Sequence, residues 1–168
     1  MPITYASGSG SAGPPRLSTP EWWFEKVVKE NVEDFENNPV SIRRAFNAVV
    51  TTYHFPERIW HYHEQRGSLD KLGCGSLLAT EYQKFRECLE KREDLRLLGD
   101  VVNPTKHHVR NRTSKEDPFK YAVATDMARS ENGELRIYDA QGKCYGRTLD
   151  LLNTTIQYWE RWLAKHPS

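Results

Sequence analysis

The sequence predicts a mainly α-helical protein of the α+β class, with a small β element close to its C-terminus. Apolar residues recur every three or four positions between about 18 and 112, and Gly, Pro and Asn residues separate these runs. Short β-rich segments occur only between about 119 and 147. We therefore expect one domain over residues 18–168: a four-helix bundle, a β-hairpin or meander, and a closing helix. Residues 1–17, rich in Gly, Ser and Pro, are expected to form a flexible tail.

Composition restricts the class of protein. No apolar stretch approaches the roughly 20 residues that span a bilayer, and no basic-then-apolar start indicates a secretion signal. The three cysteines, Cys74, Cys88 and Cys144, are odd in number and lack C-x-x-C spacing. This argues against a disulfide framework and a cysteine-based zinc site, and favours a cytoplasmic location. A net charge of +1 gives no global attraction to nucleic acid, so any such binding needs a local patch.

The first two helices are expected over residues 19–37 and 40–66. Thr19 is a suitable N-cap, Pro20 suits the first helical position, and Asn37-Asn38-Pro39 ends the first helix. Pro56 lies inside the second helix and should kink or split it, because proline removes a backbone hydrogen bond and clashes with the preceding turn. The expected apolar stripe of the second helix consists of Ile42, Phe46, Val49, Tyr53 and Trp60.

Two further helices and the β element follow. We expect helices over 75–92 and 94–112, the latter interrupted at Asn103-Pro104. Segments 121–125, 135–138 and 143–145 are typical of short strands, and Asp139-Ala140-Gln141-Gly142 is typical of a hairpin turn. The closing helix, over 148–165, has one apolar stripe made of Leu152, Ile156, Trp159 and Leu163.

A cluster rich in histidine lies on the second expected helix. Glu57 falls close to Phe46 on the stripe taken to face the core, and a carboxylate buried there needs a partner. His54 and His61, three residues before and four after Glu57, can reach it. The pattern leaves three roles open: a structural hydrogen-bonded knot, an acid–base or ligand-binding pair, and half of a metal site. A metal site needs further ligands from a facing helix.

A second polar cluster spans residues 100–108. On an unbroken helix Asp100, Asn103 and His107 share one face, and Lys106 and Arg110 flank them. One interpretation is a solvated polar face. The other is a site at a cleft or dimer interface, with an imidazole as acid or base and two cations that hold a phosphate.

Taken together, the motifs in these two clusters resemble those of a known group of proteins. The motif Asp100-x-x-Asn103-x-x-Lys106-His107, after a helix with His54-x-x-Glu57, resembles a group of small bacterial proteins that end in a β-hairpin and a tryptophan-rich helix. The hairpin here is 135–145, and Trp159 and Trp162 lie on the last helix. Through its four-helix core this group is similar to the HEPN superfamily. Many HEPN proteins are metal-independent ribonucleases, used as toxins or in defence, that dimerise to form their active cleft.

The resemblance implies a HEPN-like, RNA-acting homodimer that needs no metal or cofactor. His107 then acts as general base or acid, with Asp100, Asn103, His54 and Glu57 beside it, and Lys106 with Arg110 or Arg58 stabilises charge on phosphorus. Arg58-x-x-x-x-His63 matches the R-x(4–6)-H motif of HEPN nucleases, and His61 joins it as a binding residue. Two alternatives remain: a non-catalytic module that binds a nucleotide or a protein partner, and a metal-binding helical enzyme that uses His54, Glu57, His61 and His107.

Overall fold

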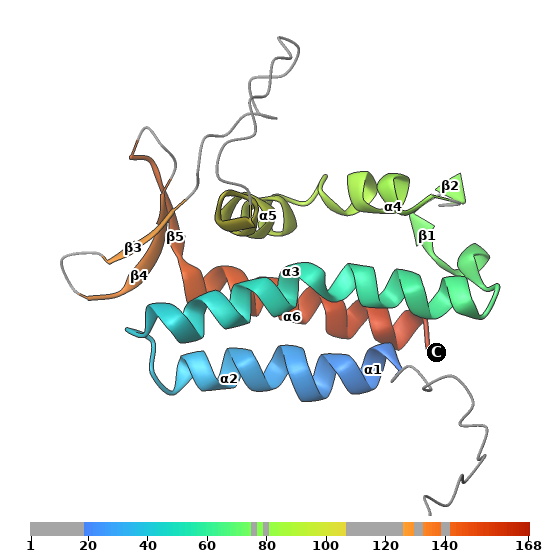
Figure 1. Cartoon of the computed structure of the whole chain (residues 1–168), viewed down its shortest axis with the longest axis horizontal. Helices are drawn as coiled ribbons and strands as arrows, with labels where there is room; N and C mark the ends of the chain where they lie inside the picture. The colour runs from blue at the N-terminus through green and yellow to red at the C-terminus, as the bar shows by residue number, and fades with distance from the viewer. Residues whose placement is uncertain (1–18, 75–76, 79–80, 107–125, 130–132, 139–141) are drawn as a thin grey trace, which may run out of the picture.

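The computed structural model describes residues 19–74, 77–78, 81–106, 126–129, 133–138 and 142–168. Side chains of residues 73–78, 103–106 and 126–129 are not among the described features. The chain is mainly helical, with antiparallel strands directly before its C-terminal helix (Figure 1). The fold class expected from the sequence is therefore confirmed in its coarse form, whereas the tail predicted over 1–17 lies outside the described residues. None of the described helices is long and apolar enough to cross a membrane.

The first helical stretch contains three segments: α1 (Pro20–Trp23), a π-helical segment η1 (Phe24–Lys29) and α2 (Glu30–Glu36). The predicted N-cap is confirmed, because the Thr19 hydroxyl accepts a hydrogen bond from the amide of Trp22 at 3.2 Å. The π-helical segment was not predicted. The side of the stretch that faces the core carries apolar residues at spacings of four, four and three. These residues are all buried: Phe24, Val28, Val32 and Phe35.

The long helix α3 (Ile42–Gln65) is continuous through Pro56. The alternative that proline splits the helix is therefore wrong. Phe55 and Ile59, on either side of Pro56, are fully buried in one core cluster with residues of η1, α5 and α6. This packing outweighs the backbone hydrogen bond that the proline removes, since tertiary contacts supply most of the stability of a helix in a protein.

The buried face of α3 is rotated from the expected stripe. Ile42 is 51% exposed, and Phe46 and Tyr53 are only half-buried. Small side chains mark the true inner face, because Ala45, Ala48 and Thr52 are fully buried and let neighbouring helices approach closely. A stripe defined by large apolar residues missed them. The full buried set is Ala45, Ala48, Val49, Thr52, Phe55, Pro56, Ile59, Trp60, Tyr62 and His63.

The segment after α3 differs from the expected helix over 75–92. A 3₁₀ turn η2 (Leu69–Lys71) leads into two short antiparallel strands, β1 (Gly73–Cys74) and β2 (Leu77–Leu78), and α4 begins only at Tyr82 (Tyr82–Leu89). Leu77 and Leu78, which were expected in the first turn of that helix, therefore lie in a strand instead. Cys88 of α4 is disulfide-bonded, whereas Cys144 is free and exposed. An odd cysteine count therefore did not exclude a disulfide.

Helix α5 (Glu93–Lys106) crosses α3 and is seen nearly end-on in Figure 1. Gly99 lies at the crossing, where a Cβ atom would come within 2.8 Å of Cε2 of Tyr53. Only glycine permits this approach without a shift of the tyrosine ring. The helix continues past Asn103-Pro104, so the predicted interruption there is wrong, and residues 107–112 lie outside the described part of the chain.

The β element is an antiparallel sheet in the order β3-β4-β5, formed by β3 (Asp126–Arg129), β4 (Leu135–Tyr138) and β5 (Cys144–Arg147). The second predicted strand is confirmed, and the third begins one residue later than predicted and extends to Arg147. The first predicted strand, 121–125, lies outside the described residues. Buried Leu135 and Ile137 pack in one core cluster with Leu152 of α6 (Thr148–Lys165), whose predicted bounds are confirmed.

Candidate functional site

A strip of alternating histidine and glutamate side chains lies along the outer side of α3. Nδ1 of His54 is 3.1 Å from Oε2 of Glu57, and Nδ1 of His61 is 3.1 Å from Oε2 of Glu64. Nε2 of His61 also lies 3.8 Å from Oε1 of Glu57, which links the two pairs. These four residues recur at spacings of three and four, so they share one helix face. We call them the His–Glu strip.

The strip is open to solvent. The side chain of Glu57 is 44% exposed, and those of His54 and His61 are 29% and 51% exposed. The prediction that Glu57 is largely buried is wrong, because the inner face of α3 is rotated away from it. The predicted partnership with His54 is confirmed. Two imidazoles accessible to a ligand, each held by a carboxylate, are therefore available for proton transfer.

Arg58 lies at the edge of the strip, four residues after His54 and three before His61. Its guanidinium carbon sits 4.2 Å from the centroid of the Trp23 ring, so a cation–π contact with the first helical stretch holds the side chain. No ion pair of Arg58 is found within the described part of the chain. The guanidinium edge is thus left to face an anion next to the two imidazoles.

His63 belongs to a different environment. It is 2% exposed, and Nδ1 lies 2.9 Å from the hydroxyl of Ser68 just beyond the helix. Burial, aided by the positive charge of Lys71, lowers the pKa of His63. Five residues separate it from Arg58, a rotation of about 140° on the helix. The Arg58-x-x-x-x-His63 match therefore does not form one site.

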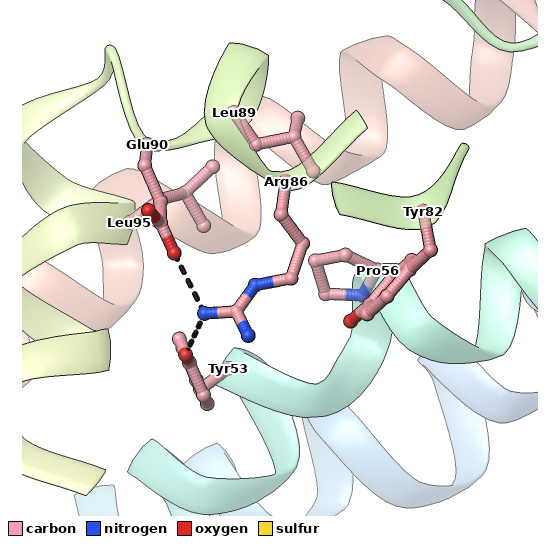
Figure 2. Close-up of a pocket in the computed structure, with 7 residues that line it drawn as sticks. All are labelled: Tyr53, Pro56, Tyr82, Arg86, Leu89, Glu90 and Leu95. Atoms are coloured by element: carbon pink, nitrogen blue, oxygen red, sulfur yellow. Dashed lines mark hydrogen bonds and ion pairs between the residues drawn. The ribbon is translucent and has the colours of Figure 1, made fainter. Parts of the chain in front are cut away.

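A polar junction joins α4 to α3 beside the strip (Figure 2). One guanidinium nitrogen of Arg86 donates hydrogen bonds to the hydroxyl of Tyr53 and to Oε1 of Glu90, the latter at 2.6 Å. The ring of Tyr53 stands edge-on to that of His54, with 5.2 Å between their centroids. Sequence reasoning missed this contact, because Tyr53 and Arg86 are 33 residues apart.

The hollow around this junction is small. It encloses about 280 Å³ of empty space, part of it open to solvent. Burial raises the pKa of Tyr82, one of its walls, to about 12, so this phenol stays protonated at neutral pH. Arg86 holds Tyr53, and the ring of Tyr53 packs against that of His54, so the junction positions the start of the strip. The residues that line the hollow are Tyr53, Pro56, Tyr82, Arg86, Leu89, Glu90 and Leu95.

A wider groove lies between the start of α5, β5 and α6, with about 1030 Å³ of empty space including open solvent. Asp94 in its wall is buried, and it accepts hydrogen bonds from Arg92 at 2.8 Å and from Thr155 at 3.3 Å. These bonds satisfy the buried carboxylate and tie α5 to α6. No sequence motif pointed to this groove, because its walls come from three separate segments of the chain.

The second polar cluster is only partly visible. Asp100 lies one residue beyond the crossing at Gly99, and Oδ2 of its half-buried side chain is 3.4 Å from Nη1 of Arg96. The side chains of Asn103 and Lys106, in the last turn of α5, lie outside what the structure describes, as do His107 and Arg110. The structure thus brings together His54, Glu57, Arg58 and His61, and it places Asp100 on the neighbouring helix.

Within the described residues, no three side chains of His, Cys, Asp or Glu are grouped to hold a metal ion. Protein-family models, curated proteins and solved structures provide no match to the chain. The chemistry of the site must therefore be inferred from its own side chains.

Proposed function

We propose that this chain is a HEPN-like protein that acts on RNA and cleaves it without a metal ion. The observation that carries the proposal is the His–Glu strip with Arg58 at its edge: two solvent-accessible imidazoles, each paired with a carboxylate at 3.1 Å, and one guanidinium between them in the sequence. Two proton-transfer groups and one cation are the parts that transphosphorylation of RNA requires.

In the proposed reaction one imidazole removes the proton from a ribose 2′-hydroxyl, and the 2′-oxygen attacks the adjacent phosphorus. The bond from O2′ to phosphorus forms while the bond from phosphorus to O5′ breaks, and the second imidazole, as imidazolium, gives its proton to O5′. The products are a 2′,3′-cyclic phosphate and a 5′-hydroxyl. Because the nucleophile is the 2′-hydroxyl, the reaction is restricted to RNA.

The side chains of the strip divide these tasks. His54 and His61 lie two helical turns apart, about 10 Å along the axis, with the carboxylate of Glu57 between them, so each ring can reach a different end of a phosphodiester that lies along the strip. Glu57 fixes the orientation of the His54 ring and stabilises its charged form when the proton arrives. Arg58 faces the phosphate oxygens, where charge accumulates in the transition state.

The resemblance assigns a further proton-transfer role to His107, and charge stabilisation to Lys106 and Arg110. The activities of the His54 and His107 variants can therefore be compared to decide which imidazoles transfer the protons. If His54 and His61 are the acid–base pair, His107→Ala retains most of the activity. If His107 is one of the two, its loss is as severe as that of His54.

The test is cleavage of end-labelled single-stranded RNA in EDTA by the wild type and by the His54→Ala, His61→Ala and His107→Ala variants. General acid–base catalysis contributes roughly 10²–10⁴-fold, so loss of an essential imidazole is plain on a gel. His166→Ala is the matched control, because His166 stacks on Trp162 just beyond α6 and forms no part of the strip. If the wild type cuts no RNA, the nucleotide- or protein-binding module replaces this proposal. If cleavage needs a divalent cation, the metal-dependent enzyme replaces it.

A further inference from the structure

Large apolar side chains are exposed at two places among the described residues. Val40 and Ile42 lie at the turn from α2 to α3, where they are 46% and 51% exposed. Trp22, 51% exposed, lies at the start of α1, which is the opposite end of the same helical stretch (Figure 1). Trp22 thus presents an indole to solvent at the end of the bundle that carries the C-terminal half of α3.

The next residue, Trp23, contacts Arg58 at the edge of the His–Glu strip. Trp23 supports the guanidinium of Arg58, 4.2 Å from its ring centroid, and so connects α1 to the edge of the strip. The lysines of the same helical stretch are neutralised: Lys26 pairs with Glu30 at 3.4 Å, and Lys29 pairs with Glu25 at 3.3 Å. Arg58 has no such ion pair within the described residues, so this corner presents a cation held on Trp23, the residue next to the exposed Trp22.

We propose that Trp22 and the Trp23–Arg58 pair form a platform for single-stranded RNA. A base stacks on the indole of Trp22, and the phosphate next to that base, the one on which the His–Glu strip acts, binds the guanidinium of Arg58. The platform rests on the proposed function, since it delivers the strand to the His–Glu strip. Aromatic side chains and arginine planes are the groups on which unpaired bases stack. The bases of a duplex are stacked on one another, so the platform selects single strands.

The binding test uses the full chain and a fluorescently labelled single-stranded 2′-O-methyl oligoribonucleotide, which lacks the 2′-hydroxyl nucleophile and is not cleaved. Fluorescence anisotropy then gives Kd without interference from catalysis. Trp22→Ala should weaken binding about 10-fold or more, the loss expected for one base–aromatic stack, whereas Trp22→Phe should retain most of it. Ile42→Ala is the matched control, because it removes an equally exposed apolar side chain at the other end of the bundle and should leave Kd unchanged.

Arg58→Ala gives the second signature. It should weaken binding and reduce the slope of log Kd against log salt by about 1, the change expected when one phosphate contact is lost. Trp22→Ala should leave that slope unaltered. A melting temperature unchanged in Trp22→Ala confirms that the folded state is intact.

The outcomes separate the platform from the proposed reaction. If Trp22→Ala binds like the wild type, or if a duplex of the same sequence binds as tightly as the single strand, the platform is wrong even when the wild type cleaves RNA. If Trp22→Ala weakens binding and the wild type cleaves nothing, the platform stands and the catalytic proposal fails. If the wild type binds no single-stranded RNA, both fail.

Discussion

His61 and His63, two residues apart on α3, differ in solvent exposure and in their partners. His61 is half-exposed and pairs with two carboxylates, whereas His63, two residues on, is 2% exposed and hydrogen-bonded to Ser68. On an α-helix, residues two positions apart are separated by a rotation of about 200°, so one imidazole faces solvent and the other faces the core. Burial therefore decides which histidine is available for chemistry and which stabilises the end of the bundle.

The largest expected contrast is in activity. His61→Ala should lower cleavage of RNA in EDTA by roughly 10²–10⁴-fold, because it removes one of the two proposed proton-transfer groups. Its free energy of unfolding should change by less than about 0.5 kcal/mol, as for other exposed substitutions. The measurement is an initial rate beside a urea titration of the same preparation. Equal activity of His61→Ala and wild type would remove His61 from the mechanism.

The buried member of the comparison should show the opposite behaviour. His63→Ala leaves a cavity in the core and strips the hydroxyl of Ser68 of its partner, so it should lower the free energy of unfolding by about 2–3 kcal/mol. Equilibrium urea unfolding measures this, with His61→Ala as the control. A loss below about 0.5 kcal/mol would show that the site of His63 relaxes or refills without cost.

The pH dependence of stability sharpens the same contrast. The pKa of His63 is lowered in the folded chain by burial and by Lys71 and His166, with Glu21 acting in the opposite direction. At acidic pH the unfolded chain therefore binds a proton that the folded chain resists. This contribution to stability is complete above the unfolded value near 6.5 and falls as the pH is lowered below it, by up to about 1.4 kcal/mol per pH unit.

Urea unfolding at a series of pH values between about 5 and 8 tests this sign, because those values span the ordinary pKa of histidine. The wild type should lose more stability on acidification than His63→Gln, which keeps a polar side chain but binds no proton. Parallel curves for the two proteins would mean that His63 titrates alike in the folded and unfolded states.

The last prediction concerns Glu57, for which only a small effect on stability is expected. Its carboxylate is 44% exposed and pairs with exposed or half-exposed imidazoles, and such surface pairs contribute about 0.2–1 kcal/mol. Glu57→Gln should therefore lower stability by less than about 1 kcal/mol while slowing cleavage, because His54 loses its orienting partner. Glu33→Gln, on α2, is a control on an exposed carboxylate away from the strip. A stability loss well above 1 kcal/mol would restore the buried knot that the sequence suggested.

Local features of this protein could be predicted because they depend on near neighbours in the chain. The bounds of α6, the Thr19 cap and the pairing of His54 with Glu57 three residues later all follow from helix geometry and a few side chains. Features in which tertiary packing overrides the local preference of the chain were missed. Leu77 and Leu78 pair as a strand where a helix was expected, α4 begins only at Tyr82, and α3 and α5 both continue through a proline.

The sequence by itself determined which segments become helices, where most of them begin and end, and which acidic and imidazole groups face one another along α3. Only the tertiary structure decided which side of α3 is inside, because small alanines and a threonine mark that side and contribute little to a stripe defined by large apolar residues. It also decided every contact between distant segments: Gly99 against Tyr53, Arg86 on Tyr53, and Arg58 on Trp23. These contacts depend on how helices cross, and helix crossing is set by the packing of whole faces rather than by spacing along one chain segment.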